Sequence, residues 1–99
     1  MSSNEIARKN DVMRSTFIGC RVVMTEAVSA APNKEEILSA VRNFKDFTTG
    51  NNPYGEHDFA FFEVDGESYF FKFDYYDDDY EHFKEDGNRV LTIGFANEY

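Results

Sequence analysis

Residues 57–75 read HDFAFFEVDGESYFFKFDY, and the fold prediction starts from this stretch. Asp65 and Gly66 form a preferred two-residue turn between two ring-rich runs, so the stretch predicts a β-hairpin. Because strand side chains alternate between the faces of a sheet, a two-residue turn places Phe62 opposite Tyr69. The face suited to a core then carries Ala60, Phe62, Val64, Tyr69, Phe71, Phe73 and Tyr75.

Helices and further strands are predicted on both sides of this hairpin. Ser2 with Glu5 forms a capping box, and Asn33 with Glu36 resembles a second one. The apolar face of the second helix consists of Ile37, Val41, Phe44 and Phe47. The predicted elements are a helix over 2–17, a strand over 20–25, a helix over 34–47, hairpin strands over 57–64 and 67–75, an acidic connector over 76–88 and a strand over 89–96. This order, α-β-α-β-β-β, predicts one α+β domain over 1–99, with a four-stranded, mostly antiparallel sheet and two helices on one face.

The charge is concentrated in the second half of the chain. The 99 residues hold 19 Asp and Glu against 10 Lys and Arg, a formal net charge of −9. Residues 1–50 have seven basic and six acidic side chains, whereas residues 51–99 have three and thirteen, a net charge of −10. This balance argues against direct binding of DNA, RNA or an anionic membrane, which needs a basic face.

Several short segments of the sequence can be read together. They are Asn10 and Asp11 with Arg14, the stretch 19–23 with Thr25, GEHDF at 55–59, KFDYYD at 72–77, RVLTI at 89–93, and the closing Glu98 and Tyr99. In this order they resemble a family of small bacterial proteins known as a domain of unknown function. Its pattern runs roughly ND..R, G.V..T, NDP.GEHDFG, K.DYYD and RVLTIMLA.EY. The chain departs from this pattern at DDYEHFKEDGN and again at residues 94–97.

The resemblance implies a protein carried by plasmids, prophages or other mobile elements, and it implies no particular activity. Cys20 is the one cysteine and cannot form an internal disulfide. The opening MSSNEIARKND lacks the apolar stretch of a signal peptide, and no run reaches transmembrane length. We therefore expect the protein in the cytoplasm of a bacterial host cell.

Three constellations could carry chemistry. His57, next to Asp58 and opposite Asp74 in the predicted hairpin, could be a general base, or it could belong to a hydrogen-bond network that fixes a loop. Cys20 could be a nucleophile beside Arg21, or a small core residue. The oxygen-rich stretch from Asp74 to His82 lacks the ligand spacing of a calcium loop, and no phosphate-binding loop or CxxC pair is present, so we expect no metal and no cofactor.

The acidic surface is the remaining candidate, and it points to a protein partner. Carboxylates on an extended strand lie ~6.6–6.8 Å apart on one face, which approximates the charge spacing of a DNA backbone. The other interpretation is a solvated face that maintains solubility. The residues expected to bind a partner are Glu63, Asp65, Glu67, Asp74, Tyr76, Asp77, Asp78, Asp79, Tyr80, Glu81, Glu85 and Asp86.

In size and acidity the chain also looks like the small anti-CRISPR proteins that imitate DNA. The leading prediction is therefore an inhibitor carried by a phage or mobile element. It would occupy the basic groove of a subunit of a CRISPR surveillance complex of the Cascade type and block recognition of target DNA. The alternatives are a small enzyme or toxin-like factor using His57, and a non-catalytic interaction module of a mobile element. A monomer is expected rather than a homodimer, with no direct contact to nucleic acid or membrane.

Overall fold

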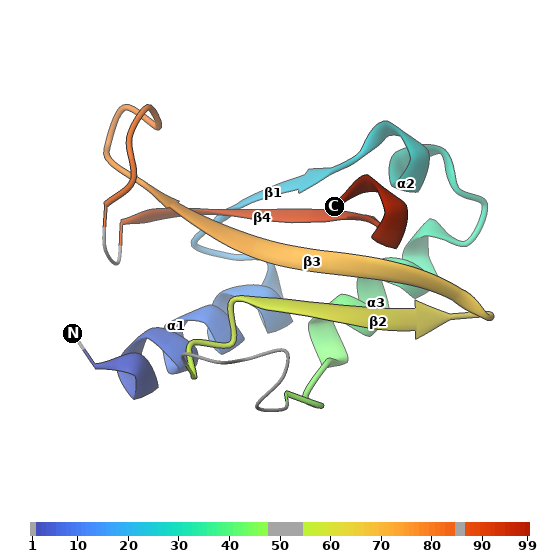
Figure 1. Ribbon diagram of the computed structural model, residues 1–99, viewed down its shortest axis with the longest axis horizontal. Helices are drawn as coiled ribbons and strands as arrows, with labels where there is room; N and C mark the ends of the chain where they lie inside the picture. The colour runs from blue at the N-terminus through green and yellow to red at the C-terminus, as the bar shows by residue number, and fades with distance from the viewer. Residues whose placement is uncertain (1, 48–54, 85–86) are drawn as a thin grey trace.

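The computed structural model describes residues 2–47, 55–84 and 87–99, and it has the predicted α+β class (Figure 1). Its elements are α1 (Ser3–Thr16), β1 (Arg21–Met24), α2 (Glu26–Ala30), α3 (Lys34–Asn43), β2 (Phe59–Val64), β3 (Glu67–Tyr76), β4 (Asn88–Phe95) and the 3₁₀ helix η1 (Ala96–Glu98). None of the helices in this described part of the chain is long and apolar enough to cross a membrane.

The sheet is built around the predicted hairpin. β2, β3 and β4 form an antiparallel meander, and β1 runs parallel to β4 at the outer edge, so the strand order is β1-β4-β3-β2. Phe62 lies opposite Tyr69, as predicted. Asp65 and Gly66 have φ values of 53° and 81°, as a tight hairpin turn with two left-handed central residues requires. The expected four-stranded, mostly antiparallel sheet is therefore confirmed.

One face of the sheet packs against the helices and forms the core. The sheet contributes the buried side chains of Ala60, Phe62, Tyr69, Phe71, Phe73, Tyr75, Leu91 and Ile93. The helices contribute Ile6 from α1, Val28 from α2, and Ile37 and Val41 from α3. The hairpin face predicted as the core face is the buried one, with Val64 half-buried at its rim.

The second predicted helix is shorter than expected, and a further short helix precedes it. α3 ends at Asn43, and Phe44 adopts an extended backbone, so Phe44 and Phe47 are not on the helix. Both rings instead turn onto Phe71 in edge-to-face contacts. Asn33 lies at the N-cap of α3 as expected, but its side chain makes no capping bond and instead donates to the Asp65 carboxylate, 3.4 Å away.

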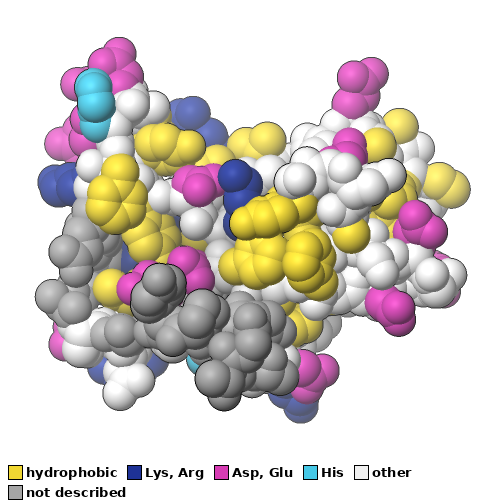
Figure 2. Space-filling view, viewed as in Figure 1, with side chains coloured by type: hydrophobic (Ala, Val, Ile, Leu, Met, Phe, Trp, Pro, Cys, Tyr) yellow, Lys and Arg dark blue, Asp and Glu magenta, His cyan; other side chains and the backbone are white. Residues whose placement is uncertain are grey.

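The other face of the sheet lies away from α1, α2 and α3, and we call it the open face. Three rings of β2 and β3, Phe59, Phe61 and Phe70, meet the ring of Tyr99 there, with centroids 4.7–5.9 Å from it. η1 carries the chain back to this position. Figure 2 shows the resulting hydrophobic cluster in the middle of the open face, with basic and acidic side chains close by.

Candidate functional site

The first candidate site is a tight turn at one end of the sheet. The chain leaves β3 at Tyr76 and returns at Phe83, which pairs with Tyr76 in an isolated antiparallel bridge. The Asp77 amide donates to the His82 carbonyl, 2.7 Å away, and Tyr80 has a left-handed backbone. We call residues 77–83 the acidic turn. Asp77, Asp79 and Glu81 therefore do not alternate along an extended strand, because the chain reverses direction here.

Asp77 has a structural role in the acidic turn. Its Oδ1 accepts hydrogen bonds from the backbone amides of Asp79 and Glu81, each 3.1 Å away. These bonds, that of Glu81 first, hold the pKa of the Asp77 carboxyl below its ordinary value. Asp78, Asp79 and Glu81 are exposed, and the Phe83 side chain is 75% exposed. The turn therefore offers three carboxylates and an aromatic ring to a partner (upper left in Figures 1 and 2).

A groove on the open face brings three of the predicted residues together. Asp74, Tyr76 and Tyr80 line it with Arg21 and Lys72, and its volume is about 370 Å³. Lys72 Nζ lies 3.1 Å from Asp74 Oδ2, and the Arg21 guanidinium stacks over the Tyr80 ring at 4.3 Å. Asp74 and Tyr80 thus each have a basic neighbour, which a basic side chain of a partner could replace.

The remaining predicted residues are far from the acidic turn or outside the description. Glu63, Asp65 and Glu67 are exposed at the tip of the hairpin, at the opposite end of β3. A ten-residue strand spans about 30 Å, so the acidic residues form two separate clusters. Glu85 and Asp86 lie outside the described residues. At the tip, a hydrogen bond with the Asp65 carboxyl group raises the pKa of Glu36.

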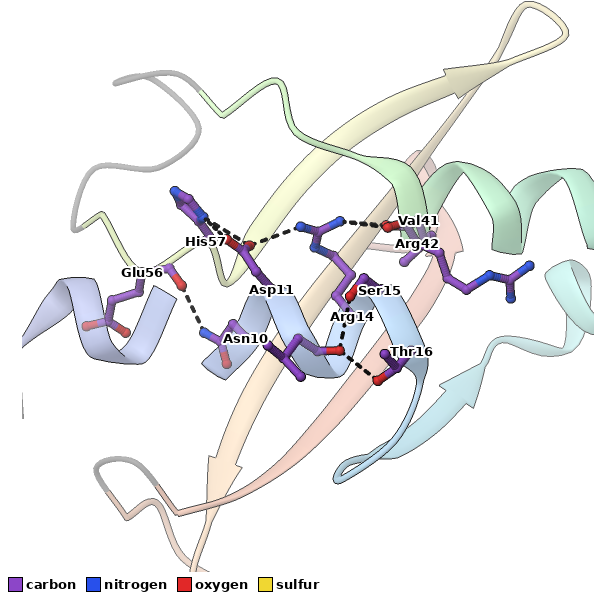
Figure 3. A network of polar contacts seen from close by, with 10 residues as sticks. Asn10, Asp11, Arg14, Ser15, Thr16, Val41, Arg42, Glu56 and His57 are labelled. Atoms are coloured by element: carbon purple, nitrogen blue, oxygen red, sulfur yellow. Dashed lines mark hydrogen bonds and ion pairs between the residues drawn. The ribbon is translucent and has the colours of Figure 1, made fainter. Parts of the chain in front are cut away.

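His57 is paired differently from the prediction. Its Nδ1 lies 3.0 Å from both carboxylate oxygens of Asp11 on α1 (Figure 3), and its ring also stacks flat on Phe47 with the centroids 4.1 Å apart. The expected pairing of His57 with Asp74 is wrong. The left-handed backbone of His57, with φ of 54°, breaks the strand alternation before β2 begins and leaves Asp74 with Lys72.

Asp58 has a backbone role at the start of the hairpin, although its carboxyl group also interacts electrostatically with His57. Its carbonyl accepts the amide of Phe73 at 2.8 Å, which extends the hairpin ladder by one bond. Burial raises the pKa of the Asp58 carboxyl, and the negative charge of Asp74 raises it further. Asp58 is therefore a half-buried residue at the strand end.

Arg14 extends the His57–Asp11 pair into the core, and the prediction missed it. Its guanidinium donates to the Asp11 carboxylate at 3.0 Å and to the Val41 carbonyl at 2.8 Å (Figure 3). The residue is only 4% exposed and lies over the rings of Phe47 and Phe71. A buried arginine that holds the Asp11 carboxylate fixes the orientation of the whole pair.

Asn10 is the centre of a second buried network, which was also missed. Its amide nitrogen donates to the Glu56 carbonyl and to the Tyr75 hydroxyl, both 2.9 Å away, and its oxygen accepts from Arg89 Nε at 2.7 Å. The Tyr75 hydroxyl donates to the Glu56 carboxylate at 3.1 Å. Burial raises the pKa of Tyr75. The short segments that carry the family resemblance, ND..R, GEHD, DYY and RVLTI, thus meet in space. Their occurrence together in the sequence was the signal that could have revealed the networks.

The described residues offer little support for the other chemistry considered. Cys20 is half-buried, and burial raises the pKa of its thiol, although the charge of Arg89 opposes this. A thiol with a raised pKa is a poor nucleophile at neutral pH. Within residues 2–47, 55–84 and 87–99, no three His, Cys, Asp or Glu side chains are grouped as metal ligands.

Comparison with known protein families matches a region that contains most, but not all, of the residues in these networks. No curated protein and no solved structure matches the chain. The family model described as "Protein of unknown function (DUF3768)" matches residues 24–98. Asn10, Asp11 and Arg14 precede the matched region, but their side chains bond to Val41, Glu56, His57, Tyr75 and Arg89 within it. Since the match covers well over half of the sequence, the chain belongs to the DUF3768 family of proteins of unknown function.

Proposed function

We propose that this protein is a non-enzymatic inhibitor that binds a basic nucleic-acid-binding protein through the acidic turn. The observation that carries the proposal is the exposure of this turn: the carboxylates of Asp78, Asp79 and Glu81 share it with the 75% exposed ring of Phe83. Aromatic anchors dominate binding energy at interfaces, and surrounding charges steer association. An apolar ring this exposed has a solvation cost that a partner would remove.

The position of the second acidic cluster supports imitation of DNA. The hairpin tip with Glu63, Asp65 and Glu67 lies about 30 Å from the acidic turn along β3. One turn of B-DNA is about 34 Å long. A groove that contacts phosphates one helical turn apart would meet one acidic cluster of this protein at each end of β3.

The target that we propose is a subunit of a CRISPR surveillance complex, which makes the protein an anti-CRISPR factor of a phage or other mobile element. The small size, the net charge of −9 and the family's resemblance to cargo of mobile elements support this assignment. The protein would act as a monomer in the cytoplasm of the bacterial host. It would occupy the groove that otherwise receives target DNA.

The test compares binding of purified surveillance complex to labelled target DNA with and without the protein. The wild-type protein should reduce DNA binding, and Asp78→Lys, Asp79→Lys and Glu81→Lys combined should abolish this effect. Asp77 is left intact because it organises the turn. The matched control reverses three exposed acids elsewhere, Glu26, Glu35 and Asp46, and should keep most of the activity. Equal loss in both triple variants would show a net-charge effect and contradict a specific surface.

A second candidate function is a small enzyme that uses His57 as a general base. One observation favours it: a carboxylate at 3.0 Å from Nδ1 orients the ring, as general-base histidines require. Asp11 takes the place of the Asp74 that the sequence suggested. His57→Ala should then abolish activity without lowering the melting temperature, whereas a purely structural pair would give the opposite result.

A further inference from the structure

A basic groove lies on α1, on a chain that is otherwise strongly acidic. Its volume is about 480 Å³, and the side chains that line it include Arg8, Lys9, Val12, Met13, Ile18 and Arg89. Among the described residues, its lining contains three cationic side chains and no acidic one. A site with this charge, on a protein of net charge −9, selects an anionic group.

The groove is also apolar between its charges. Val12 and Ile18 are 61% and 73% exposed, which is unusual for aliphatic side chains that lie together. Arg89 is buried and bonded to Asn10 and to the Gly87 carbonyl, so it forms a wall of the groove. The exposed cations are Arg8 and Lys9. The groove therefore suits a segment that presents carboxylates together with an apolar side chain.

We propose that this groove binds the acidic turn of a second copy of the chain. The turn has the complementary composition: Asp79 and Glu81 are exposed carboxylates without a side-chain partner described here, and Phe83 is an exposed ring. Carboxylates would pair with Arg8 and Lys9, and the Phe83 ring would cover Val12 and Ile18. This pairing buries the largest exposed ring of the turn and places opposite charges at its rim.

The relative position of the two surfaces favours a closed dimer. The Phe83 ring lies 6.4 Å from the Tyr75 ring, which in turn lies 4.9 Å from the Arg89 guanidinium carbon in the wall of the groove. Turn and groove are thus neighbours at one end of the molecule. Two copies related by a two-fold axis at this end can each insert the turn into the other's groove, so both contacts form in one dimer.

Self-association of this kind competes with binding of any other partner by the acidic turn. It uses the same turn as the proposed function but does not depend on the identity of that partner, since it is measured on the purified protein alone. The partner-bound form is then the monomer, and the dimer is the resting form at high protein concentration. Dimerisation protects the exposed ring until a partner of higher affinity displaces the second copy.

The test is sedimentation equilibrium of the whole chain over a concentration series. At about 0.05 M NaCl the average mass should rise from 11.5 kDa towards twice that value, and at about 0.5 M NaCl it should fall back. Arg8→Glu with Lys9→Glu should be monomeric, as should Asp79→Lys with Glu81→Lys. An equimolar mixture of the two double variants should regain the dimer, because each turn then meets a groove of opposite charge. This recovery also excludes misfolding as the cause of dissociation.

The matched control is Lys34→Glu with Lys45→Glu, which makes the same change of charge outside the groove and should leave the dimer intact. A wild-type protein that stays monomeric at all concentrations overturns the proposal. A dimer that persists in both groove and turn variants overturns it too, because the contact would then lie elsewhere, such as on the rings of the open face. Neither result bears on inhibition of DNA binding, so the two proposals fail separately.

Discussion

Asn10 provides the sharpest test of the buried networks. Asn10→Ala removes an amide that is fully buried and makes three hydrogen bonds: to the Glu56 carbonyl, to the Tyr75 hydroxyl and from Arg89 Nε. The substitution leaves the partners in place but takes away the group that joins them. Because these partners come from the segment before β2, from β3 and from β4, the loss affects the packing of α1 on the sheet.

The expected loss of stability can be worked out from these contacts. A hydrogen bond from a charged donor such as Arg89 contributes about 1.5–3 kcal/mol, and each of the two neutral bonds contributes about 1 kcal/mol. Tyr75 still donates to the Glu56 carboxylate, and Arg89 still donates to the Gly87 carbonyl, so some compensation remains. We expect Asn10→Ala to lower the free energy of unfolding by about 3–4 kcal/mol. For a domain of this size this corresponds to a fall in Tm of about 15–25 °C.

Urea denaturation followed by circular dichroism measures this change, since the chain has no tryptophan. Asn97→Ala, at an exposed position, is the control and should change stability by less than about 0.5 kcal/mol. Tyr75→Phe should lose about 1–2 kcal/mol, and the double variant should be less destabilised than the sum of the single variants, because the two side chains share one hydrogen bond. A loss below about 1 kcal/mol for Asn10→Ala would refute the reasoning.

Two further predictions concern the sheet. Gly94→Ala would place a Cβ 2.7 Å from Phe70 Cε1 and 2.8 Å from Thr25 Cγ2. We therefore expect the free energy of unfolding, measured by urea denaturation, to fall by about 1–3 kcal/mol and to recover in part when Phe70→Leu is added. An unchanged urea midpoint would contradict the close approach. Burial raises the pKa of the Asp58 carboxyl above its ordinary value, so the folded state binds this proton more tightly than the unfolded state does. The contribution of Asp58 to stability therefore falls as the pH rises from the unfolded-state pKa to the folded-state pKa. Asp58→Asn should remove that fall in a pH series of urea midpoints, and a wild-type profile in the variant would rule the assignment out.

The hairpin could be predicted from sequence because its information is local. Asp65 and Gly66 fix the turn, the turn fixes the register, and the period of two then assigns every side chain to a face. The same reasoning failed at His57, where a left-handed backbone ends the alternation before the strand begins. For residues 77–83 the sequence indicates only an acidic composition, and the turn itself depends on hydrogen bonds from backbone amides to Asp77.

The networks around Asn10 and Arg14 lay beyond what a single sequence can assign. Their partners are separated by tens of residues, and a polar residue on a helix gives no sign of whether it faces the core or the solvent. The buried positions of Arg14 and Arg89 likewise depend on the rings of Phe47, Phe71 and Tyr75, which the fold brings over them. The sequence shows which polar and aromatic side chains are available, but the topology of the fold determines which of them come into contact.

The parallel pairing of β1 with β4 has a consequence for synthesis. Arg21 pairs with Val90 and Met24 with Ile93, so one edge strand emerges from the ribosome long before its neighbour. Until residues 88–95 have been released, the nascent chain holds the aromatic hairpin without the strand that separates it from β1. Contacts this distant in sequence slow folding, and an unpaired aromatic strand invites association with other chains. Chains that end before β4 should therefore aggregate or be degraded rather than persist as partly folded protein.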